Sequence, residues 1–205
     1  MSTRFKYPQG DTHFEQHGEW YKYQVKNKKA LRNYLDETKA FLDLGAHCGT
    51  WTLWFAPLVP HVYSYEPVHY GVLEQNLVEY NIQNVSVRPR ALSNSTGTRT
   101  IWVRTDNSGD TGFLGKGTVN RTPIDVHTTR LDLETFDHPI GTIKMDLQGH
   151  ELEALQGAEQ IIRTHTPTLC VEFDTGNPMG ERLLKEWGYT LARRSGKDWI
   201  FILDK

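Results

Sequence analysis

The chain has little cysteine, little net charge and no long hydrophobic run. Its two cysteines, Cys48 and Cys170, stand far apart in 205 residues, so they indicate neither a disulfide framework nor a zinc site. This low cysteine usage predicts a reducing compartment. The polar first residues lack the apolar segment of a signal peptide, so we expect a cytoplasmic protein. The longest apolar runs fall well short of the roughly 20 residues that cross a bilayer, so we expect no membrane contact.

The charge balance gives the chain no general attraction to nucleic acids or acidic surfaces. The formal net charge is −2, and basic residues gather only at Lys26, Lys28, Lys29 and Arg32. Such a run is usually one solvated face of a helix, which is what we expect here. The length suits a single domain, and we predict an N-terminal extension over residues 1–38 followed by the main domain over 39–205.

Short apolar runs alternate with segments of helical periodicity through most of the main domain. Residues 151–163 carry an apolar stripe on one side, and residues 69–80 place apolar side chains near a helical period. This alternation predicts an α/β fold, with a doubly wound, mostly parallel sheet of seven strands and helices on both faces. The expected strands include 40–44, 61–65, 85–88, 142–147 and 168–173, with a C-terminal antiparallel hairpin over 189–193 and 199–203.

Two segments depart from this alternation. Residues 98–104 predict an additional strand, and residues 105–123 are rich in glycine, threonine, asparagine and aspartate, which indicates a long loop. A loop of that length inside a compact domain usually has a function. Aromatic residues and lysines over 20–35 predict a helix in the N-terminal extension. That extension is expected either to cap the site or to pack on a second subunit in a homodimer.

A glycine turn between an apolar strand and a helix is the strongest functional signal in the chain. The turn consists of Gly45, Ala46, His47, Cys48 and Gly49. Its glycines let a ligand approach the backbone closely. Glu66, about 20 residues further on at the tip of the next strand, is placed to bind two ribose hydroxyls.

The spacing within this turn favours one nucleotide-like ligand over another. It is G-x-x-x-G rather than the G-x-G-x-x-G of dinucleotide sites, and Asp43 just before it would repel a pyrophosphate. An NAD-dependent oxidoreductase is therefore disfavoured. S-adenosylmethionine carries a ribose, an ammonium and a sulfonium but no phosphate, so it fits the pattern better.

Carboxylates also end two later strands. Asp146 ends one of them, with His150 at the start of the following helix, and Glu172 ends another. Ligands of doubly wound sheets bind at the carboxyl ends of the strands. We therefore expect Asp146 and Glu172 to face the same crevice as Asp43 and Glu66.

Together these motifs resemble the FkbM-type S-adenosylmethionine-dependent methyltransferases over about residues 40–175. The resemblance rests on D-L-G-A-x-x-G at 43–49, Y-E-P at 65–67, A-L-S-N at 91–94 and, above all, K-M-D-L-Q-G-H-E at 144–151. It implies a class I, Rossmann-like methyltransferase fold with S-adenosyl-L-methionine as cofactor. The implied reaction is methylation of a hydroxyl on a small molecule, often a sugar or glycoside. Many members carry alanine where this chain has His150.

Position by position, the resemblance implies a cofactor site along the strand ends. Glu66, with Pro67 after it, binds the ribose, and Asp146 approaches the ammonium or the methyl end. Arg90 and Ala91 lie near the adenine. The wall around the methionine part is formed by Asp43, Gly45, Ala46, His47 and Gly49, together with the backbone of Cys48.

An alcohol acceptor loses a proton as it attacks, so a positioned base accelerates methyl transfer. The candidates are His150, Asp146 and Glu172. His150 has the most suitable unperturbed pKa, near 6.5, although it can equally be a helix-start residue that hydrogen-bonds a neighbour. The same three side chains can alternatively hold a divalent cation that orients a diol, but the sequence establishes no metal ligand.

Two other functions stay open. A nucleic-acid methyltransferase shares the chemistry, but residues 146–149 do not form the Asn/Asp-Pro-Pro-aromatic motif of base amino-group methylation. A Pro-Cys nucleophile is also absent, and the charge does not suit a phosphate-tracking surface. A non-catalytic module that binds a nucleoside or a protein is the second alternative, because a fold alone does not determine function. The partner that we expect is a small-molecule or carbohydrate acceptor.

Overall fold

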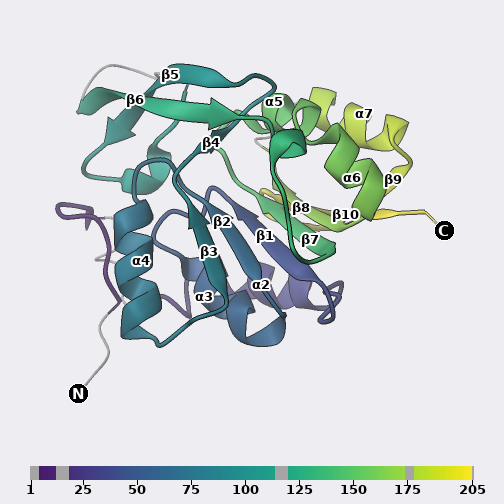
Figure 1. Cartoon of the computed structure of the whole chain (residues 1–205), viewed down its shortest axis with the longest axis horizontal. Helices are drawn as coiled ribbons and strands as arrows, with labels where there is room; N and C mark the ends of the chain where they lie inside the picture. Colours follow the sequence, from purple (N-terminus) through teal and green to yellow (C-terminus); the bar gives the residue numbers. More distant parts are fainter. Residues whose placement is uncertain (1–4, 13–18, 114–119, 174–177, 205) are drawn as a thin grey trace.

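Seven strands form the central sheet in the order β3-β2-β1-β7-β8-β10-β9 (Figure 1). The computed structural model describes residues 5–12, 19–113, 120–173 and 178–204. The pairs among the first five strands of that order are parallel, and β10 runs antiparallel to both β8 and β9. This confirms the predicted fold class and the C-terminal hairpin. The strands are β1 (Ala40–Leu44), β2 (Val62–Tyr65), β3 (Val85–Arg88), β7 (Ile140–Met145), β8 (Thr168–Glu172), β9 (Tyr189–Ser195) and β10 (Asp198–Leu203).

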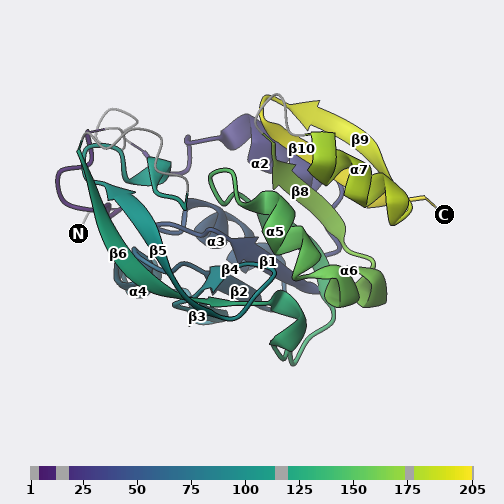
Figure 2. The same cartoon turned by 90° about the horizontal axis from the view of Figure 1, so that it is seen from above.

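Helices cover both faces of this sheet, as Figure 2 shows from above. Every residue of β1 and β7 is buried, because a parallel sheet packed on both faces leaves no solvated side. One apolar cluster joins β1 and β7 to α5 (Glu151–Gln156), α6 (Glu159–His165) and α7 (Pro178–Glu186). On the opposite face, two clusters hold α2 (Val25–Arg32), α3 (Thr50–Phe55) and α4 (Tyr70–Glu79).

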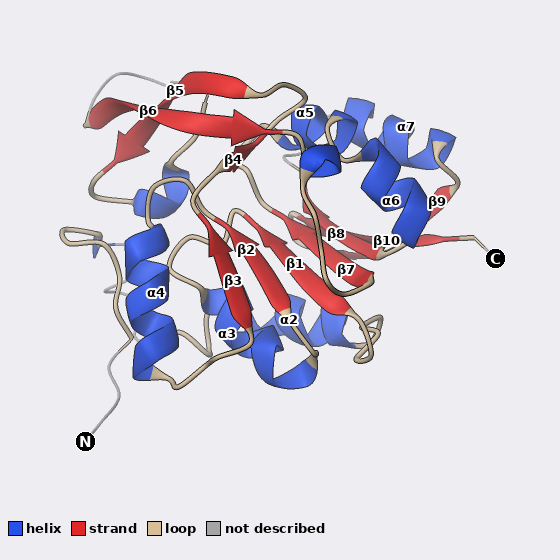
Figure 3. Cartoon of the chain, viewed as in Figure 1, coloured by secondary structure: helices blue, strands red, loops and turns tan. Residues whose placement is uncertain are grey.

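A second, three-stranded sheet stands beyond the carboxyl ends of the main strands (Figures 1 and 3). It contains β4 (Ala91–Leu92), β5 (Gly97–Arg104) and β6 (Arg121–Thr129) in the order β4-β6-β5. The extra strand over 98–104 is thus confirmed. The predicted loop over 105–123 is wrong at its end, because 121–123 belong to β6, and its residues 114–119 lie outside the described part of the chain. Strand β6 is mostly polar and only partly buried, so it lacks the apolar run by which a strand can be predicted.

Two predicted helices have different bounds in the structure. The stripe over 151–163 is divided between α5 and α6, because the chain turns at Gly157. A Cβ there would lie 2.0 Å from the carbonyl oxygen of Ser93, so only glycine permits this close approach. The helix predicted over 20–35 is limited to α2, with turns on either side.

The described part of the N-terminal segment packs against the main domain. Phe5 is buried with residues of α3 and α4. The Asn76 side chain binds the backbone of Lys6 on both sides, accepting from its N–H at 2.7 Å and donating to its carbonyl at 2.8 Å. The division at residue 38 stays a prediction. Among the described residues, no helix has the length and apolar character needed to cross a membrane.

Candidate active site

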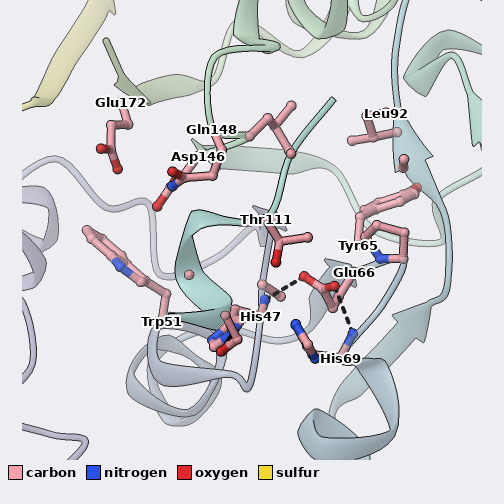
Figure 4. A pocket seen from close by; sticks show the side chains of 18 of the residues that line it. His47, Trp51, Tyr65, Glu66, His69, Leu92, Thr111, Asp146, Gln148 and Glu172 are labelled. Atoms are coloured by element: carbon pink, nitrogen blue, oxygen red, sulfur yellow. Dashed lines mark hydrogen bonds between the residues drawn. The ribbon is translucent and has the colours of Figure 1, made fainter. Parts of the chain in front are cut away.

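A cavity lies at the carboxyl ends of the central strands, and Figure 4 shows most of the side chains that line it. Gly45 follows β1, Glu66 follows β2, Asp146 follows β7, and Glu172 is the last residue of β8. Ile101 of β5 lines the cavity from the small sheet. The cavity therefore lies between the two sheets, at the edge where a doubly wound fold binds its ligands.

The glycine turn is held between the two neighbouring strands. The backbone N–H groups of Gly45 and Ala46 both donate to the carbonyl of Tyr65 at 3.0 Å. Gly45 has φ +81°, and a Cβ on it would lie 1.9 Å from the carbonyl oxygen of Asp146. Both the conformation and the contact demand glycine, so this turn cannot shift without displacing the end of β7.

Glu66 is fixed by backbone donors at the wall of the cavity. Its Oε2 accepts from the N–H of His47 at 2.9 Å, and its Oε1 accepts from Val68 at 2.8 Å and His69 at 2.9 Å. The side chain is 7% exposed, and Figure 4 shows two of these bonds. Glu66 thus couples the glycine turn to the start of α4.

Asp146 and Glu172 form a hydrogen-bonded carboxyl pair in the cavity wall. Burial and the neighbouring Asp146 raise the pKa of Glu172 to about 8. Burial alone would raise the pKa of Asp146 too, but Lys144 and hydrogen bonds from Glu172 and Gln148 lower it. The pair therefore holds one proton near neutral pH, and that proton resides on Glu172.

A buried lysine compensates this acidic end. Lys144 is 2% exposed and lines the cavity, with Nζ 3.4 Å from Asp146 Oδ2 and 4.0 Å from Asp43 Oδ1. Burial favours the neutral amine, but the two aspartates outweigh it and raise the pKa of Lys144. The ammonium therefore stays charged and keeps Asp146 ionised.

Among the described residues that line the cavity, three that are not glycine have a left-handed backbone. They are Gln24 (φ 50°), His47 (φ 51°) and Gln148 (φ 55°). This conformation costs about 1–2 kcal/mol per residue and gathers at functional sites. Interactions with neighbours hold two of them in place: Gln24 Oε1 accepts from Trp51 Nε1 at 2.6 Å, and Gln148 Nε2 donates to Asp146 Oδ1 at 2.7 Å.

Most of the residues predicted for the site line this one cavity. They are Gly45, Ala46, His47, Glu66, Pro67, Arg90, Ala91, Asp146 and Glu172. The roles predicted for them in cofactor binding and catalysis stay predictions at this point. The cavity is also lined by residues that were not predicted from the sequence as site residues, notably Tyr23, Gln24, Trp51, His69, Thr111, Lys144 and Gln148.

Three predicted cofactor residues do not line the cavity. Asp43 is fully buried and accepts a hydrogen bond from Thr52 Oγ1 at 2.7 Å, so it links β1 to α3 beneath the surface of the cavity. Cys48 is fully buried in an apolar cluster, and burial raises the pKa of its thiol. Gly49 (φ +93°) lies against Leu73, whose Cδ1 would be 2.4 Å from an added Cβ.

His150 also lies outside the cavity lining. Its Nε2 is 3.0 Å from Ser93 Oγ, and its Nδ1 is 3.5 Å from Glu153. Its ring packs at 4.3 Å against Phe113, which does line the cavity. Burial lowers the pKa of His150. This placement matches the alternative in which His150 hydrogen-bonds neighbours at a helix start, and it gives no support to a role as base.

The proposed cation site has no counterpart in the described residues. In that part of the chain, no three His, Cys, Asp or Glu side chains are grouped so that they could hold a metal ion. Asp146 and Glu172 pair with each other, while His150 binds Ser93 on another side. The geometry therefore does not support a cation held by these three residues.

One member of the basic run departs from prediction. Lys26, Lys29 and Arg32 are exposed as expected, but Lys28 is fully buried. Three tryptophan rings surround its Nζ. The centroid of Trp20 lies 5.8 Å away, and those of Trp51 and Trp54, both on α3, lie 6.0 and 5.6 Å away. Burial lowers the pKa of Lys28 to about 7.

We expect Lys28→Met to raise the free energy of unfolding by about 1–4 kcal/mol at pH 6, because methionine fills similar space without a charge to desolvate. In the wild type, Lys28 is protonated in the unfolded chain but largely neutral in the native state between pH 7 and 10.5. The contribution of Lys28 to the free energy of unfolding therefore rises with pH in that range. The gain from the substitution should therefore shrink toward pH 10. Urea unfolding at both pH values measures it, with exposed Lys29→Met as control. A loss of stability at pH 6 would show that the cation–π contacts dominate.

The strand order and the strand-end cavity define a class I, Rossmann-like methyltransferase fold. The family model described as Methyltransferase FkbM domain matches residues 43–196. The chain therefore belongs to the FkbM methyltransferase family, which confirms the resemblance recognised in the sequence. A search of curated proteins finds no significant match.

Solved structures share this fold at low identity. Methyltransferase FkbM from Methylobacillus flagellatus KT has a TM-score of 0.59 and 17% identity, over 81% of this chain and 44% of that one. The chain thus spans less than half of that protein. The match to an rRNA methylase from Streptococcus thermophilus (TM-score 0.51, 16% identity) covers 88% of this chain and 94% of that one. The match to a putative rRNA-methylase from Clostridium thermocellum (TM-score 0.53, 10% identity) covers 88% of this chain and 96% of that one. At these identities the likeness concerns the fold and not the acceptor.

Proposed function

We propose that this chain is an S-adenosylmethionine-dependent methyltransferase that methylates a hydroxyl of a small molecule, such as a sugar or glycoside. One observation carries the proposal: the first three residues of the glycine turn, Glu66 and the Asp146–Glu172 pair line a single cavity at the strand ends. Glu66 is placed for a ribose, and the acidic end suits a ligand with positive charge and no phosphate. When bound, the cofactor supplies an electrophilic methyl group on its sulfonium.

The protein's own contribution is alignment and management of the acceptor proton. Asp146 is the ionised member of the carboxyl pair, and Lys144 holds it in that state. Glu172 loses its proton only near pH 8. We therefore assign proton acceptance to the Asp146–Glu172 pair rather than to His150. Trp51, Tyr23 and Gln24 line the cavity as well and offer aromatic and amide contacts to an acceptor.

The first test of the proposal is calorimetric titration of the protein with S-adenosylhomocysteine, with and without Mg²⁺. Saturable micromolar binding supports the cofactor assignment. A dependence on Mg²⁺ would revive the cation alternative at Asp146 and Glu172. Absence of binding in both conditions would sink the proposal and bring forward a non-catalytic binding module.

We expect Glu66→Ala to weaken binding of S-adenosylhomocysteine by about 10- to 100-fold, because a hydrogen bond to a charged acceptor contributes about 1.5–3 kcal/mol. Calorimetry measures the change. Glu74→Ala, at an exposed position of the adjacent helix α4, is the matched control and should bind as the wild type does. Equal affinity in Glu66→Ala and wild type would remove Glu66 from the site.

A further inference from the structure

Glu66 has limited capacity for a ribose. A carboxylate offers about four acceptor positions, two on each oxygen. Backbone N–H groups occupy two on Oε1, from Val68 and His69, and one on Oε2, from His47. About one position is left, on Oε2. A ribose presents two neighbouring hydroxyls, so one of them needs a partner other than Glu66.

Thr111 supplies such a partner. Its Oγ1 is buried, and within the described residues it has no hydrogen-bond partner, although its side chain lines the cavity. Figure 4 shows Thr111 on the same side of the cavity as Glu66 and His47. Buried polar atoms almost always have a partner, so an orphan hydroxyl in a cavity wall indicates a bond to a ligand. A hydroxyl can also donate, which the Glu66 carboxylate cannot do.

A chain of hydrogen bonds holds the segment that carries Thr111. Ser108 donates to Asp11 Oδ2 twice, from its N–H at 2.9 Å and from its hydroxyl. The hydroxyl proton of Ser108 is therefore committed to Asp11, and Ser108 Oγ accepts from His47 Nε2 at 2.7 Å. His47 Nδ1 is then the unprotonated nitrogen, and it accepts from Cys48 Sγ at 3.0 Å. The chain runs from the glycine turn, across the segment, to Asp11.

Asp11 is well suited to anchor this chain. It is fully buried, and Ser108 is 2% exposed, so water cannot readily replace the bonds between them. The next residue, Thr12, also joins the two segments, because both its N–H and its hydroxyl donate to the carbonyl of Asp106. Asp11 lies outside residues 43–196, the part that matches the family model.

We propose that Thr111 is a further cofactor-contacting residue, whose hydroxyl binds the ribose hydroxyl that Glu66 leaves unpaired. Asp11 and Ser108 are positioning residues: Ser108 bonds Asp11 and His47, and these bonds hold the segment that carries Thr111 beside the glycine turn. This inference rests on the proposed function, since it requires a ribose-bearing ligand beside Glu66. It adds a contact that neither the glycine turn nor the strand-end carboxylates provide.

The experiment compares wild type and Thr111→Val by calorimetry with S-adenosylhomocysteine and with its 2′-deoxy and 3′-deoxy analogues. We expect Thr111→Val to raise the Kd for S-adenosylhomocysteine about 3- to 10-fold, the effect of one lost hydrogen bond. The difference between variant and wild type should vanish with the analogue that lacks the contacted hydroxyl. Thr100→Val, on the exposed part of β5, is the control and should leave every Kd unchanged.

Asp11→Asn tests the positioning role. It should raise the Kd for S-adenosylhomocysteine and shift the ¹⁵N resonances of the His47 ring, because the charge that orients Ser108 is gone. Combined with Thr111→Val, it should add less than its own effect, since both act on one contact. A lower Tm with an unchanged Kd would show a merely structural Asp11 and overturn the positioning role.

The two proposals fail in different ways. If wild type binds none of the three ligands, the proposed function falls and this inference falls with it. If wild type binds S-adenosylhomocysteine and Thr111→Val binds it equally well, only the inference is overturned. The same holds if Thr111→Val loses affinity by an equal factor for all three ligands, since no single hydroxyl then depends on Thr111.

Discussion

Asp146→Asn is expected to lower methyl transfer to the acceptor by about 10²- to 10⁴-fold, the usual contribution of a positioned proton acceptor. The amide has nearly the same shape as the carboxylate, so the change removes charge rather than volume. It also removes one of the two main causes that raise the pKa of Glu172 to about 8, so that pKa should fall, while burial still holds it above 4.5. Turnover and the ¹³C titration of the Glu172 carboxyl measure the two effects separately.

The pH dependence of the wild type follows from the same pair. The pair accepts the acceptor's proton only when its own shared proton has left, so turnover should rise with pH and level off above about pH 8. The effect on stability has the opposite sign. The native pKa of Glu172 lies above its unfolded value, so stability falls as pH rises from about 4.5 to 8.

A control separates these effects from a general loss of negative charge. Asp125→Asn changes an exposed aspartate of β6 that binds Thr100, and it should alter neither turnover nor the Glu172 titration. Unchanged turnover in Asp146→Asn would exclude Asp146 as the proton acceptor and leave Glu172 and His150 as candidates. If the pKa of Glu172 in that variant were the same as in the wild type, the two carboxyls would not interact.

The sheet and its ligand-binding edge could be predicted because they follow from local patterns. Buried parallel strands give short apolar runs, and the carboxyl ends of such strands meet at one edge. Gly45, Glu66, Asp146 and Glu172 each end or follow one of these runs, so their meeting in one cavity required no knowledge of side-chain contacts. In contrast, strand β6 is stabilised by pairing with β5 and has no apolar run of its own.

The residues that the sequence did not assign correctly depend on contacts between distant segments. Asp43 and Lys144 lie opposite each other in paired strands, so whether Asp43 faces a ligand or a lysine is settled only by register. Lys28 is buried because three tryptophans surround it, two of them on another helix. His150 directly precedes α5, and its ring forms a hydrogen bond with Ser93, which is far away in the sequence. No periodicity encodes such pairings.

Gly45→Ala tests whether the glycine turn is as tightly held as its contacts indicate. We expect it to lower the free energy of unfolding by about 3 kcal/mol or more. Alanine at φ +81° costs about 1–2 kcal/mol, and its Cβ would lie 1.9 Å from the Asp146 carbonyl oxygen, which adds about 1–3 kcal/mol of overpacking. Because backbone must move to relieve that contact, the turn separates from the end of β7 and S-adenosylhomocysteine binding should be lost. Urea unfolding and calorimetry measure the two outcomes.

Gly71→Ala is the matched control for this substitution. Gly71 lies in the first turn of α4, and an added Cβ there meets nothing within 4 Å. The same chemical change should therefore stabilise the protein by up to about 1 kcal/mol, since alanine is the better helix former. If Gly45→Ala and Gly71→Ala had similar stability and both bound S-adenosylhomocysteine, the turn would be adaptable. The close approach of Gly45 to Asp146 would then have no part in shaping the cofactor site.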